Sequence, residues 1–346
     1  MENFLINDLN QETILDFKEC FDKNDSPKIL ENIEWQFFDN TEKRSVVDIA
    51  KDKASGKTAA IYAISCVKFK LNDTLVTGSQ SLDTITDIDY RGVGLFIKLA
   101  NDVYHKAKQS VNLVYGFPNG NSIAGFKKKL QWHVLDPVPF LIKPLRSKYF
   151  TNKIKALKFL PDVNLSFITY KDQKGYNIVG NHSFGIEVNE IWQKFSQNIK
   201  VCINRDYKYL HWRYIQKPNE QYAIAHCYKQ NRYVGFIVYT IKEKHEGKIG
   251  YIMELIYDPE EPKAGKLLLK YAISIIREQK ADCILSWCLE HSPNYPIFKN
   301  ALFFYLPEKI RPIELHFGAR SFDDGCDSLI SNRNNWYISY SDSDTV

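Results

Sequence analysis

The sequence predicts an α/β fold that is built from two similar halves, each with a mixed sheet. The first observation is the order of elements, in which three strands lead into a helix that begins at a glycine-rich turn. The second is the return of this order in the second half. The third is the length of 346 residues, which exceeds what one hydrophobic core usually serves. We therefore expect two domains, residues 1–148 and 149–346.

The first half contains the elements of that order one after another. Apolar residues at helical spacing predict a helix over 11–22, and Trp35 lies in or near a second short helix. Apolar runs bounded by turn residues then predict three strands, a long helix, a buried strand and a short helix, over residues 46–51, 58–68, 75–86, 94–109, 111–117 and 122–130.

The turn at residues 91–95 is the feature around which the chain is organised. Gly92 and Gly94 can adopt positive φ and carry no side chain, so successive backbone N–H groups can point into one concavity at the start of the helix. A helix N-terminus of this kind favours an anion such as a phosphate. The segment therefore predicts a phosphate cradle, for which a plain tight turn is the alternative interpretation.

The second half repeats the spacing of the first. Asp87 and Gly94 are seven residues apart, as are Asp258 and Gly265, and in both halves the next strand begins seventeen residues after the glycine. At residues 262–264 the second copy reads Pro-Lys-Ala where the first reads Arg-Gly-Val. Proline removes one N–H group and a glycine is lost, so we expect one working phosphate site, in the first half.

Composition argues against several classes of protein. The net charge of +5 is spread along the chain, so no nucleic-acid partner is expected, although a basic pocket for an acidic ligand stays open. The seven cysteines form no C-x-x-C pair, which argues against a zinc site or a disulfide framework. No apolar run approaches the ~20 residues that span a bilayer, so we expect a cytoplasmic protein without membrane insertion. The oligomeric state stays open.

The run Asp-Tyr-Arg-Gly-Val-Gly-Leu-Phe at residues 89–96 resembles the acyl-coenzyme-A motif of the GCN5-related N-acetyltransferase (GNAT) superfamily, Gln/Arg-x-x-Gly-x-Gly/Ala. Arg91 and Gly94 fit that motif, whereas Phe96 stands where a small residue is usual. The run Gly-Phe-Pro-Asn at 116–119, with Trp132, looks like a tandem-repeat branch found among bacterial surface polysaccharide genes. The resemblance implies tandem GNAT-like domains, each a twisted mixed sheet flanked by helices, with a degenerate second copy.

The resemblance also implies acetyl-CoA as cosubstrate, and no metal. It implies that the sheet splays between the strands at 75–86 and 111–117, so that the pantetheine arm pairs with backbone in the gap and the pyrophosphate rests on the glycine turn. The residues expected to hold acetyl-CoA are Ile85, Thr86, Arg91, Gly92, Val93, Gly94, Leu95, Asn119, Asn121 and Lys127. For Lys127, a solvated helix face is the alternative.

Acetyl transfer to an amine needs a base, donors for the oxyanion and a stabilised leaving thiolate. Asp83 is the first candidate base, because it lies eight residues before the motif arginine, where this superfamily often has a carboxylate; a strand-end acid is the alternative. His133 is the second candidate. The usual leaving-group tyrosine is absent from the helix at 122–130, so Tyr104, Tyr115, His133 or a water would substitute.

The acceptor is expected between the two copies. Trp35, Trp212 and Arg213 are expected to line a pocket that suits a sugar diphosphate, and Asp342 and Asp344 would bind the acceptor ammonium or hydroxyls if the tail folds back; a solvated tail is the alternative. The resemblance implies N-acetyl transfer to a nucleotide-linked amino sugar for cell-surface glycans such as O-antigen. The alternatives are another small amine, an aminoacyl-tRNA-dependent peptidoglycan-bridge transferase, and a non-catalytic acyl-CoA-binding scaffold.

Overall fold

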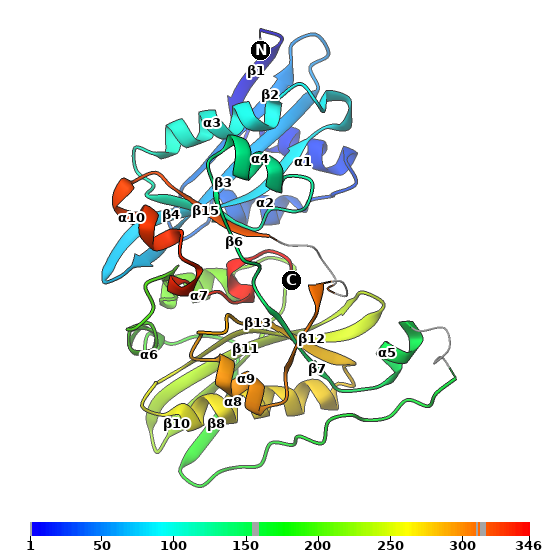
Figure 1. Ribbon diagram of the computed structural model, residues 1–346, viewed down its shortest axis with the longest axis vertical. Coiled ribbons are helices and arrows are strands. Elements are labelled where there is room, and N and C mark those ends of the chain that lie inside the picture. Colours follow the sequence, from blue (N-terminus) through cyan, green and yellow to red (C-terminus); the bar gives the residue numbers. More distant parts are fainter. Residues whose placement is uncertain (1, 154–158, 309–310, 312–315) are drawn as a thin grey trace.

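The computed structural model describes residues 2–153, 159–308, 311 and 316–346, which form two lobes, each built on a mixed sheet (Figure 1). The first sheet has the order β1-β2-β3-β4-β5-β15-β6, with β9 beside β3, and the second has the order β14-β7-β13-β12-β11-β10-β8. β4 runs parallel to β5 and β12 runs parallel to β13, whereas the other paired strands are antiparallel. The predicted mixed α/β fold is confirmed.

The longest strands lie in the middle of each sheet. The first sheet consists of β1 (Phe4–Asp8), β2 (Ser45–Asp52), β3 (Thr58–Leu71), β4 (Thr74–Thr86), β5 (Leu113–Gly116), β6 (His133–Leu135), β9 (Val201–Ile203) and β15 (Phe317–Ser321). The second sheet consists of β7 (Phe140–Pro144), β8 (Tyr176–Asn181), β10 (Ala223–Lys229), β11 (Arg232–Lys244), β12 (Gly247–Tyr257), β13 (Cys283–Trp287) and β14 (Phe304–Tyr305).

Helices cover both faces of the first sheet. α1 and α2 pack on one face around Phe17, and α3 packs on the other around Leu99. Residues 59–67 of β3 lie between these layers and are buried at every position, as expected for a strand that is covered on both faces. The helices are α1 (Ile14–Lys23), α2 (Leu30–Phe37), α3 (Leu95–Ala107), α4 (Ile123–Lys129), α5 (Lys148–Lys153), α6 (Val188–Phe195), α7 (Tyr207–Tyr214), α8 (Pro262–Glu278), α9 (Tyr295–Asn300) and α10 (Asp324–Ile330). None of the described helices is long and apolar enough to cross a membrane.

Each half of the chain contributes to the other lobe's sheet: the first half supplies β7, and the second half supplies β15 and the short β9. β7, from the first half of the sequence, lies between β13 and β14 in the second sheet, and β15, from the second half, lies between β5 and β6 in the first. Figure 1 shows β15 in orange within the upper lobe and β7 in green within the lower one. The expected boundary at 148 does not describe this arrangement, because β7 precedes it and belongs to the second sheet. Each sheet is completed by the other half of the chain.

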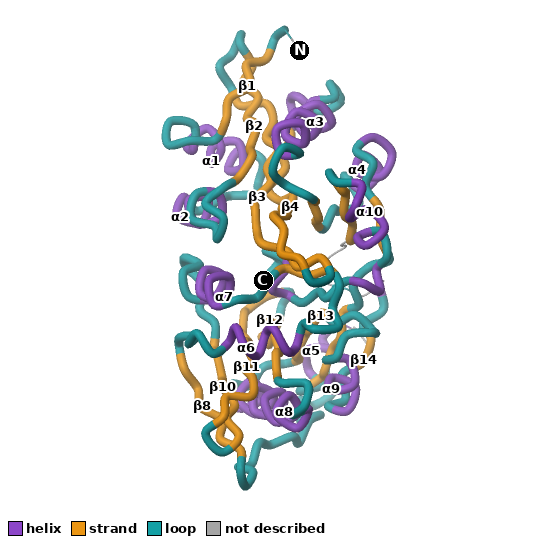
Figure 2. The backbone as a smooth tube through the Cα atoms, turned by 90° about the vertical axis from the view of Figure 1, so that its left-hand side faces the viewer, coloured by secondary structure: helices purple, strands orange, loops and turns teal. Residues whose placement is uncertain are grey.

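Helices α2 and α7 meet at the waist between the lobes, where Figure 2 shows them facing each other. Trp35 of α2 and Trp212 of α7 stack with ring centroids 4.4 Å apart and planes 12° apart. Trp35 Nε1 donates to the Trp212 carbonyl at 3.0 Å, and Trp212 Nε1 donates to the Trp35 carbonyl at 3.2 Å. This reciprocal pairing gives the waist an approximate two-fold symmetry that matches the sequence repeat.

Candidate active site

The glycine turn of the first half has the backbone that the sequence predicts. Gly92 and Gly94 have φ of 83° and 81°, and Gly94 is the N-cap of α3. A Cβ built on either glycine would meet no atom within 4 Å, so the concavity in front of the turn is open. Among the described residues, the N–H groups of 92–94 donate to no backbone carbonyl. They are therefore available to an anion at the start of a 13-residue helix.

Strand β4 provides a free backbone edge beside this turn. β4 pairs with β5 only over residues 78–81, opposite 113–116. Beyond Ser81, β4 continues to Thr86 and, within the described part of the chain, is paired on the β3 side alone. Ile85 and Thr86 lie on this free stretch, and Arg91 Nε donates to the Thr86 carbonyl at 3.4 Å. An extended amide chain such as the pantetheine arm of CoA fits a strand edge of this kind.

Helix α4 lies beside the start of α3. Phe126 of α4 and Phe96 of α3 form an edge-to-face pair with centroids 5.3 Å apart, so the bulky residue in the motif serves this packing. Asn119 accepts a hydrogen bond from the Asn121 N–H at 3.1 Å and thereby shapes the turn before α4. Asn121 and Lys127 are exposed. The side-chain oxygen of Asn119 therefore serves the turn, and its amide nitrogen is the group left for a ligand.

The equivalent turn of the second half is occupied by its own side chains. Asp258 and Glu261 precede α8 and are ion-paired with basic side chains. Carboxylates at this helix start disfavour a phosphate. Gly265 lies inside α8, where a Cβ would approach neighbouring side chains to 2.7 Å, so this glycine serves packing. Asn294 Nδ2 also donates to the Leu255 carbonyl, which takes up the free edge of β12. The geometry for an acyl-CoA site is thus present in the first half.

Asp83 lies on the free stretch of β4, at an irregularity in the β3–β4 pairing, with a φ of 50°. A non-glycine residue in this region is strained, and such strain concentrates at functional sites. The Asp83 carboxylate is ion-paired with Lys28 from the loop between α1 and α2, and its side chain is 17% exposed. Burial raises the pKa of Asp83 above its ordinary value, and the charge of Lys28 opposes this shift only in part. The raised pKa suits a general base.

Asp344 brings a second carboxylate close enough to raise the pKa of Asp83. It is ion-paired with Arg213 at 2.9 Å and Lys217 at 3.7 Å, and its side chain is 35% exposed. Burial raises the pKa of Asp344, but the charges of Arg213, Lys217 and Lys28 together outweigh burial and leave the pKa below its ordinary value. Two neighbouring carboxylates whose pKa values are shifted in opposite directions are typical of acid–base sites.

The C-terminal tail is held across the first sheet. Gln80 Nε2 of β4 and the Tyr115 hydroxyl of β5 both donate to the Asp342 carbonyl, at 3.1 and 2.9 Å. Arg213 donates to two further tail carbonyls. In Figure 1 the tail runs in red between the lobes and ends at the waist. The tail therefore folds back, and it brings Asp344 close enough to Asp83 for the two carboxylates to interact electrostatically.

Several residues expected to bind substrate have structural roles instead. Trp35 and Trp212 bury their rings against each other and use both indole N–H groups on backbone carbonyls. The space beside Trp212 and Arg213 measures about 10 Å³, which holds about one water and cannot hold a sugar diphosphate. Asp342 is buried and ion-paired with Arg205, and burial raises its pKa to about 6. The presence of aromatic and charged residues in the sequence does not show whether those residues form an interface or line a pocket.

His133 lies apart from the two carboxylates. It begins β6, which is separated from β4 by β5 and β15, or about 14 Å at the usual strand spacing. Its Nε2 lies 2.9 Å from a carboxylate oxygen of Asp327. Tyr104 is buried on the α3 side, where its hydroxyl contacts Tyr62 and accepts from Trp132 Nε1. The structure therefore brings neither His133 nor Tyr104 into contact with Asp83.

The ion pair between Lys28 and Asp83 has a counterpart in the second half. Arg205 follows Lys28 by 177 residues, the separation of the two stacked tryptophans, and it is ion-paired with Glu254, which the spacing matches to Asp83. Arg205 and Glu254 are fully buried, and side chains of the tail complete their hydrogen bonds. Sequence reasoning missed Lys28 and Lys217; the 177-residue offset is the signal that could have identified Lys28.

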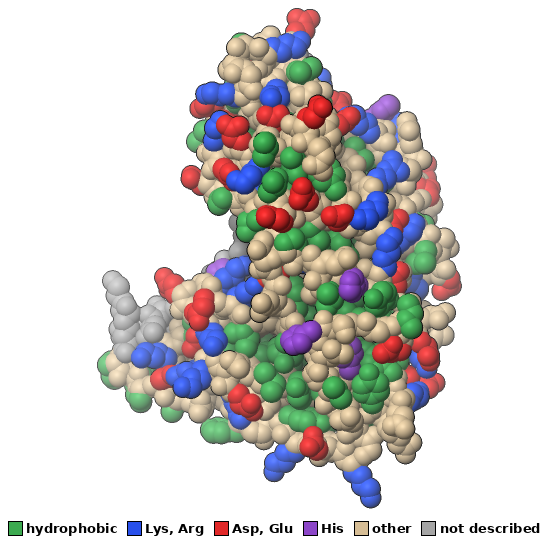
Figure 3. Space-filling view, turned by 180° about the vertical axis from the view of Figure 1, so that it is seen from behind, with side chains coloured by type: hydrophobic (Ala, Val, Ile, Leu, Met, Phe, Trp, Pro, Cys, Tyr) green, Lys and Arg blue, Asp and Glu red, His purple; other side chains and the backbone are tan. Residues whose placement is uncertain are grey.

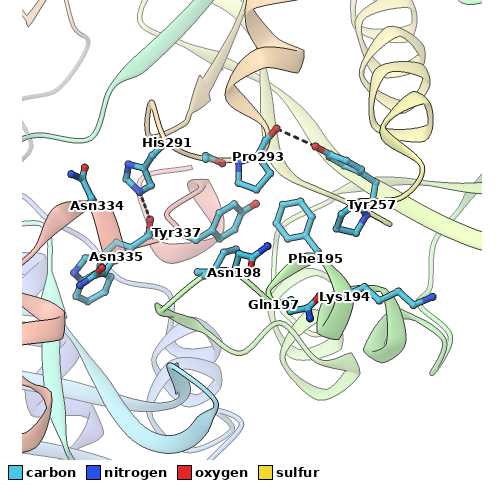
Figure 4. A pocket seen from close by; sticks show the side chains of 14 residues that line it. Lys194, Phe195, Gln197, Asn198, Tyr257, His291, Pro293, Asn334, Asn335 and Tyr337 are labelled. Carbon is cyan, nitrogen blue, oxygen red and sulfur yellow. Dashed lines mark hydrogen bonds between the residues drawn. The ribbon is translucent and has the colours of Figure 1, made fainter.

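The second lobe contains a pocket of about 330 Å³ near the end of β12. Figure 4 shows Phe195 and Tyr337 at its centre, with amide side chains around them. The Tyr257 hydroxyl donates to the Pro293 carbonyl at 3.0 Å, and His291 Nε2 donates to a tail carbonyl at 2.8 Å. These groups already have partners, and the pocket has no glycine turn like the one at residues 91–95.

Comparisons with known proteins identify the fold. No family model matches the chain, and no curated protein matches it in sequence. A GCN5-related N-acetyltransferase from Anabaena variabilis superposes with a TM-score of 0.64 at 13% identity, over 94% of this chain and 74% of that one. A tandem GNAT protein from the clavulanic acid biosynthesis pathway gives 0.58 at 11%, over 92% and 98%. Saccharomyces cerevisiae N-myristoyltransferase with bound myristoyl-CoA gives 0.58 at 12%, over 92% and 83%.

The chain therefore has the fold of tandem GNAT-like proteins, with two mixed sheets flanked by helices. The parallel strand pair of each sheet is hydrogen-bonded over four rungs only, and then separates. At identities of 11–13% the likeness concerns the fold. What this chain does with that fold depends on the residues that line its own strand edge.

Proposed function

We propose that the chain is an acetyl-CoA-dependent N-acetyltransferase, whose acceptor is the amino group of a nucleotide-linked amino sugar used in cell-surface glycan biosynthesis. The observation that carries the proposal is the continuity of one strand edge. β4 leads from the glycine turn at 91–95, past its edge at Ile85 and Thr86, which no described strand covers on the β5 side, to the carboxylate of Asp83. A cosubstrate held on the turn and along that edge would place its thioester near Asp83.

Asp83 would take the proton that the acceptor ammonium must lose before it can attack. Because burial raises its pKa, this transfer is better matched at neutral pH than it would be with an ordinary carboxylate. Asp344, whose pKa is lowered by its cationic neighbours, would stay ionised and hold the ammonium by charge-assisted hydrogen bonds. The two carboxylates therefore have separate roles, one as a base and one as a binding group.

The departing thiolate needs a proton, and the usual tyrosine on α4 is absent. At the last rung between β4 and β5, Ser81 Oγ lies 3.0 Å from the Tyr62 hydroxyl, which also contacts the hydroxyl of Tyr104. Burial raises the pKa of Tyr104 well above its ordinary value, so this phenol stays protonated. This chain of hydroxyls, which ends at Ser81, would relay to the thiolate the proton that the attacking nitrogen loses once the C–N bond has formed.

The sugar nucleotide as acceptor rests on the sequence resemblance at residues 116–119 and Trp132. With about 10 Å³ between the lobes beside Trp212, the acceptor would approach Asp83 from the solvent side, where the partly exposed Lys28 supplies positive charge for phosphates. Figure 3 shows basic and acidic side chains interspersed on the rear face. A face that carries charges of both signs does not favour binding of a tRNA, and therefore does not favour a tRNA-borne acceptor there.

The experiment has two arms. Calorimetric titration with acetyl-CoA measures binding to the full chain, and a thiol-release assay measures turnover across UDP- and dTDP-linked amino sugars, aminoglycosides and simple amines. We expect binding together with turnover on an amino sugar nucleotide. Turnover confined to another amine would change the acceptor class, and binding without turnover on any amine would support a scaffold. Absence of acetyl-CoA binding would refute the proposal.

A further inference from the structure

Lys28 is the one cation whose side chain is bonded directly to Asp83 in the described structure. It lies in the short loop between α1 and α2, directly after Pro27, whose ring restricts the backbone. A hydrogen bond of 3.2 Å from the Lys28 N–H to the Asp22 carboxylate connects the loop to helix α1. The Lys28 ammonium also lies 5.2 Å from the centre of the Phe21 ring, a cation–π distance. The ammonium is thus positioned from several sides.

This position is the one that the acceptor must occupy in the proposed reaction. A base must lie within hydrogen-bond reach of the group from which it takes a proton. The amine of any acceptor must therefore contact the Asp83 carboxylate, and the Lys28 ammonium already does so. Asp344 adds the second carboxylate that an ammonium needs there, and the electrostatic interaction between Lys28 and Asp344 lowers the pKa of Asp344.

The second half shows what a purely structural pair looks like at this position. Arg205 and Glu254 are both 0% exposed, and a guanidinium neither loses its proton in proteins nor acts as an amine nucleophile. Lys28 is 29% exposed, and a lysine can become a neutral amine. The two halves therefore differ in chemistry at this position. The second half has a buried cation that cannot act as a nucleophile, and the first half has a partly exposed lysine that can.

We propose that Lys28 is an internal acyl acceptor, so that the chain acetylates its own Lys28 when acetyl-CoA is bound and no external amine is present. The inference rests on the proposed function, because it uses the same base and the same thioester. Asp83 takes one proton from the Lys28 ammonium, and the resulting amine attacks the thioester carbonyl. A C–N bond forms, the C–S bond breaks, and the second nitrogen proton leaves with the thiolate as CoA thiol. Asp83 then returns its proton to solvent.

Acetylation changes the site as well as the side chain. An acetylated Lys28 carries no charge, so the ion pair with Asp83 is lost and the carboxylate becomes available to another ammonium. Lys28 is tethered, so its reaction has the entropic advantage of an intramolecular step. An external amine competes for the same carboxylate and should slow the modification.

The test uses peptide mass mapping of the full chain after incubation with acetyl-CoA alone. Lys51 is the matched control, because it is 28% exposed and ion-paired with Asp16, yet lies on β2 away from the free edge of β4. We expect acetylation at Lys28 to exceed that at Lys51 by about a hundredfold, as general-base catalysis supplies. In Asp83→Asn the two lysines should be equal, and in Lys28→Arg no other lysine should gain the label.

Calorimetric affinity for CoA is the second readout, and it should be unchanged in Lys28→Arg. If Lys28 is labelled no more than Lys51 while the chain still transfers acetyl groups to an external amine, the inference is wrong and the proposed function stands. If Asp83→Asn keeps the excess at Lys28 with an unchanged melting temperature, the assigned chemistry is wrong. If acetyl-CoA does not bind at all, both the inference and the proposed function are refuted.

Discussion

The two ion pairs at equivalent positions, Asp83 with Lys28 and Glu254 with Arg205, should respond differently when the carboxylate loses its charge. Asp83→Asn and Glu254→Gln each remove one negative charge while keeping the shape of the side chain. If Asp83 is a base and Glu254 is structural, the first variant should lose turnover and the second should lose stability. The repeat thus provides its own control, because both carboxylates lie on the equivalent strand beside a cation.

The structure sets the magnitudes. Removing a general base lowers kcat by about 10²–10⁴-fold, or about 3–5 kcal/mol in the activation free energy. The pair between Asp83 and Lys28 is partly exposed, so its loss changes the unfolding free energy by about 1 kcal/mol or less. Glu254 and Arg205 are fully buried, but Arg205 keeps its ion pair with Asp342 in Glu254→Gln, so the expected cost is that of the lost charge-assisted hydrogen bonds, about 1.5–3 kcal/mol.

Two measurements separate these outcomes. Thiol release under saturating acetyl-CoA gives kcat, and thermal unfolding gives the melting temperature of each variant. We expect Asp83→Asn to melt close to the parent chain with kcat reduced at least a hundredfold. Glu254→Gln should melt lower and keep its kcat per folded molecule. If Asp83→Asn retains near-normal kcat, or if both variants lose activity only in proportion to unfolding, the assignment of Asp83 as the base is refuted.

Gly94→Ala should cost about 1 kcal/mol of stability, because the φ of Gly94 is 81°. The same variant should weaken CoA binding at least tenfold, as measured by calorimetry. Gly56→Ala is the control, because Gly56 has a φ of 71° and equally open surroundings, and it should show the stability cost alone. A fragment of residues 1–148 should show no cooperative melting by circular dichroism, because β15 is missing between β5 and β6; a sharp transition would contradict this. The raised pKa of Asp342 favours folding below the unfolded value of 3.8, and this contribution of about 3 kcal/mol is lost as pH rises through about 6. Asp342→Asn should flatten that slope in melting temperature, and parallel curves for the two proteins would refute it.

The local features of the cofactor site could be predicted from the sequence. Positive φ at Gly92 and Gly94 follows from the two glycines before an amphipathic helix, because only the absence of a Cβ makes that turn inexpensive. The closed turn of the second copy follows from Pro262 and from the loss of a glycine. The free stretch of β4 was expected from the family resemblance, and the β4–β5 pairing that stops at Ser81 confirms it.

The partners of the acidic residues could not be predicted. Asp342 and Asp344 stand two residues apart in the tail, yet Asp342 is buried against Arg205, whereas Asp344 is 35% exposed and ion-paired with Arg213. Which of them faces the site depends on the direction in which each side chain leaves a tail that is held by Gln80 and Tyr115. Those contacts join residues more than two hundred positions apart, and local sequence carries no information about them.

The sequence by itself determined what depends on neighbours in the chain: the alternation of strands and helices, the repeat, and the glycine turn that could hold a phosphate. The tertiary structure alone decided what depends on long-range pairing. It placed β7 and β15 in each other's lobes, turned Trp35 and Trp212 into an interface, and set the Lys28 ammonium on Asp83. The physical reason is that backbone conformation is set locally, whereas burial, ion pairing and pKa shifts arise from residues that only the folded chain brings together.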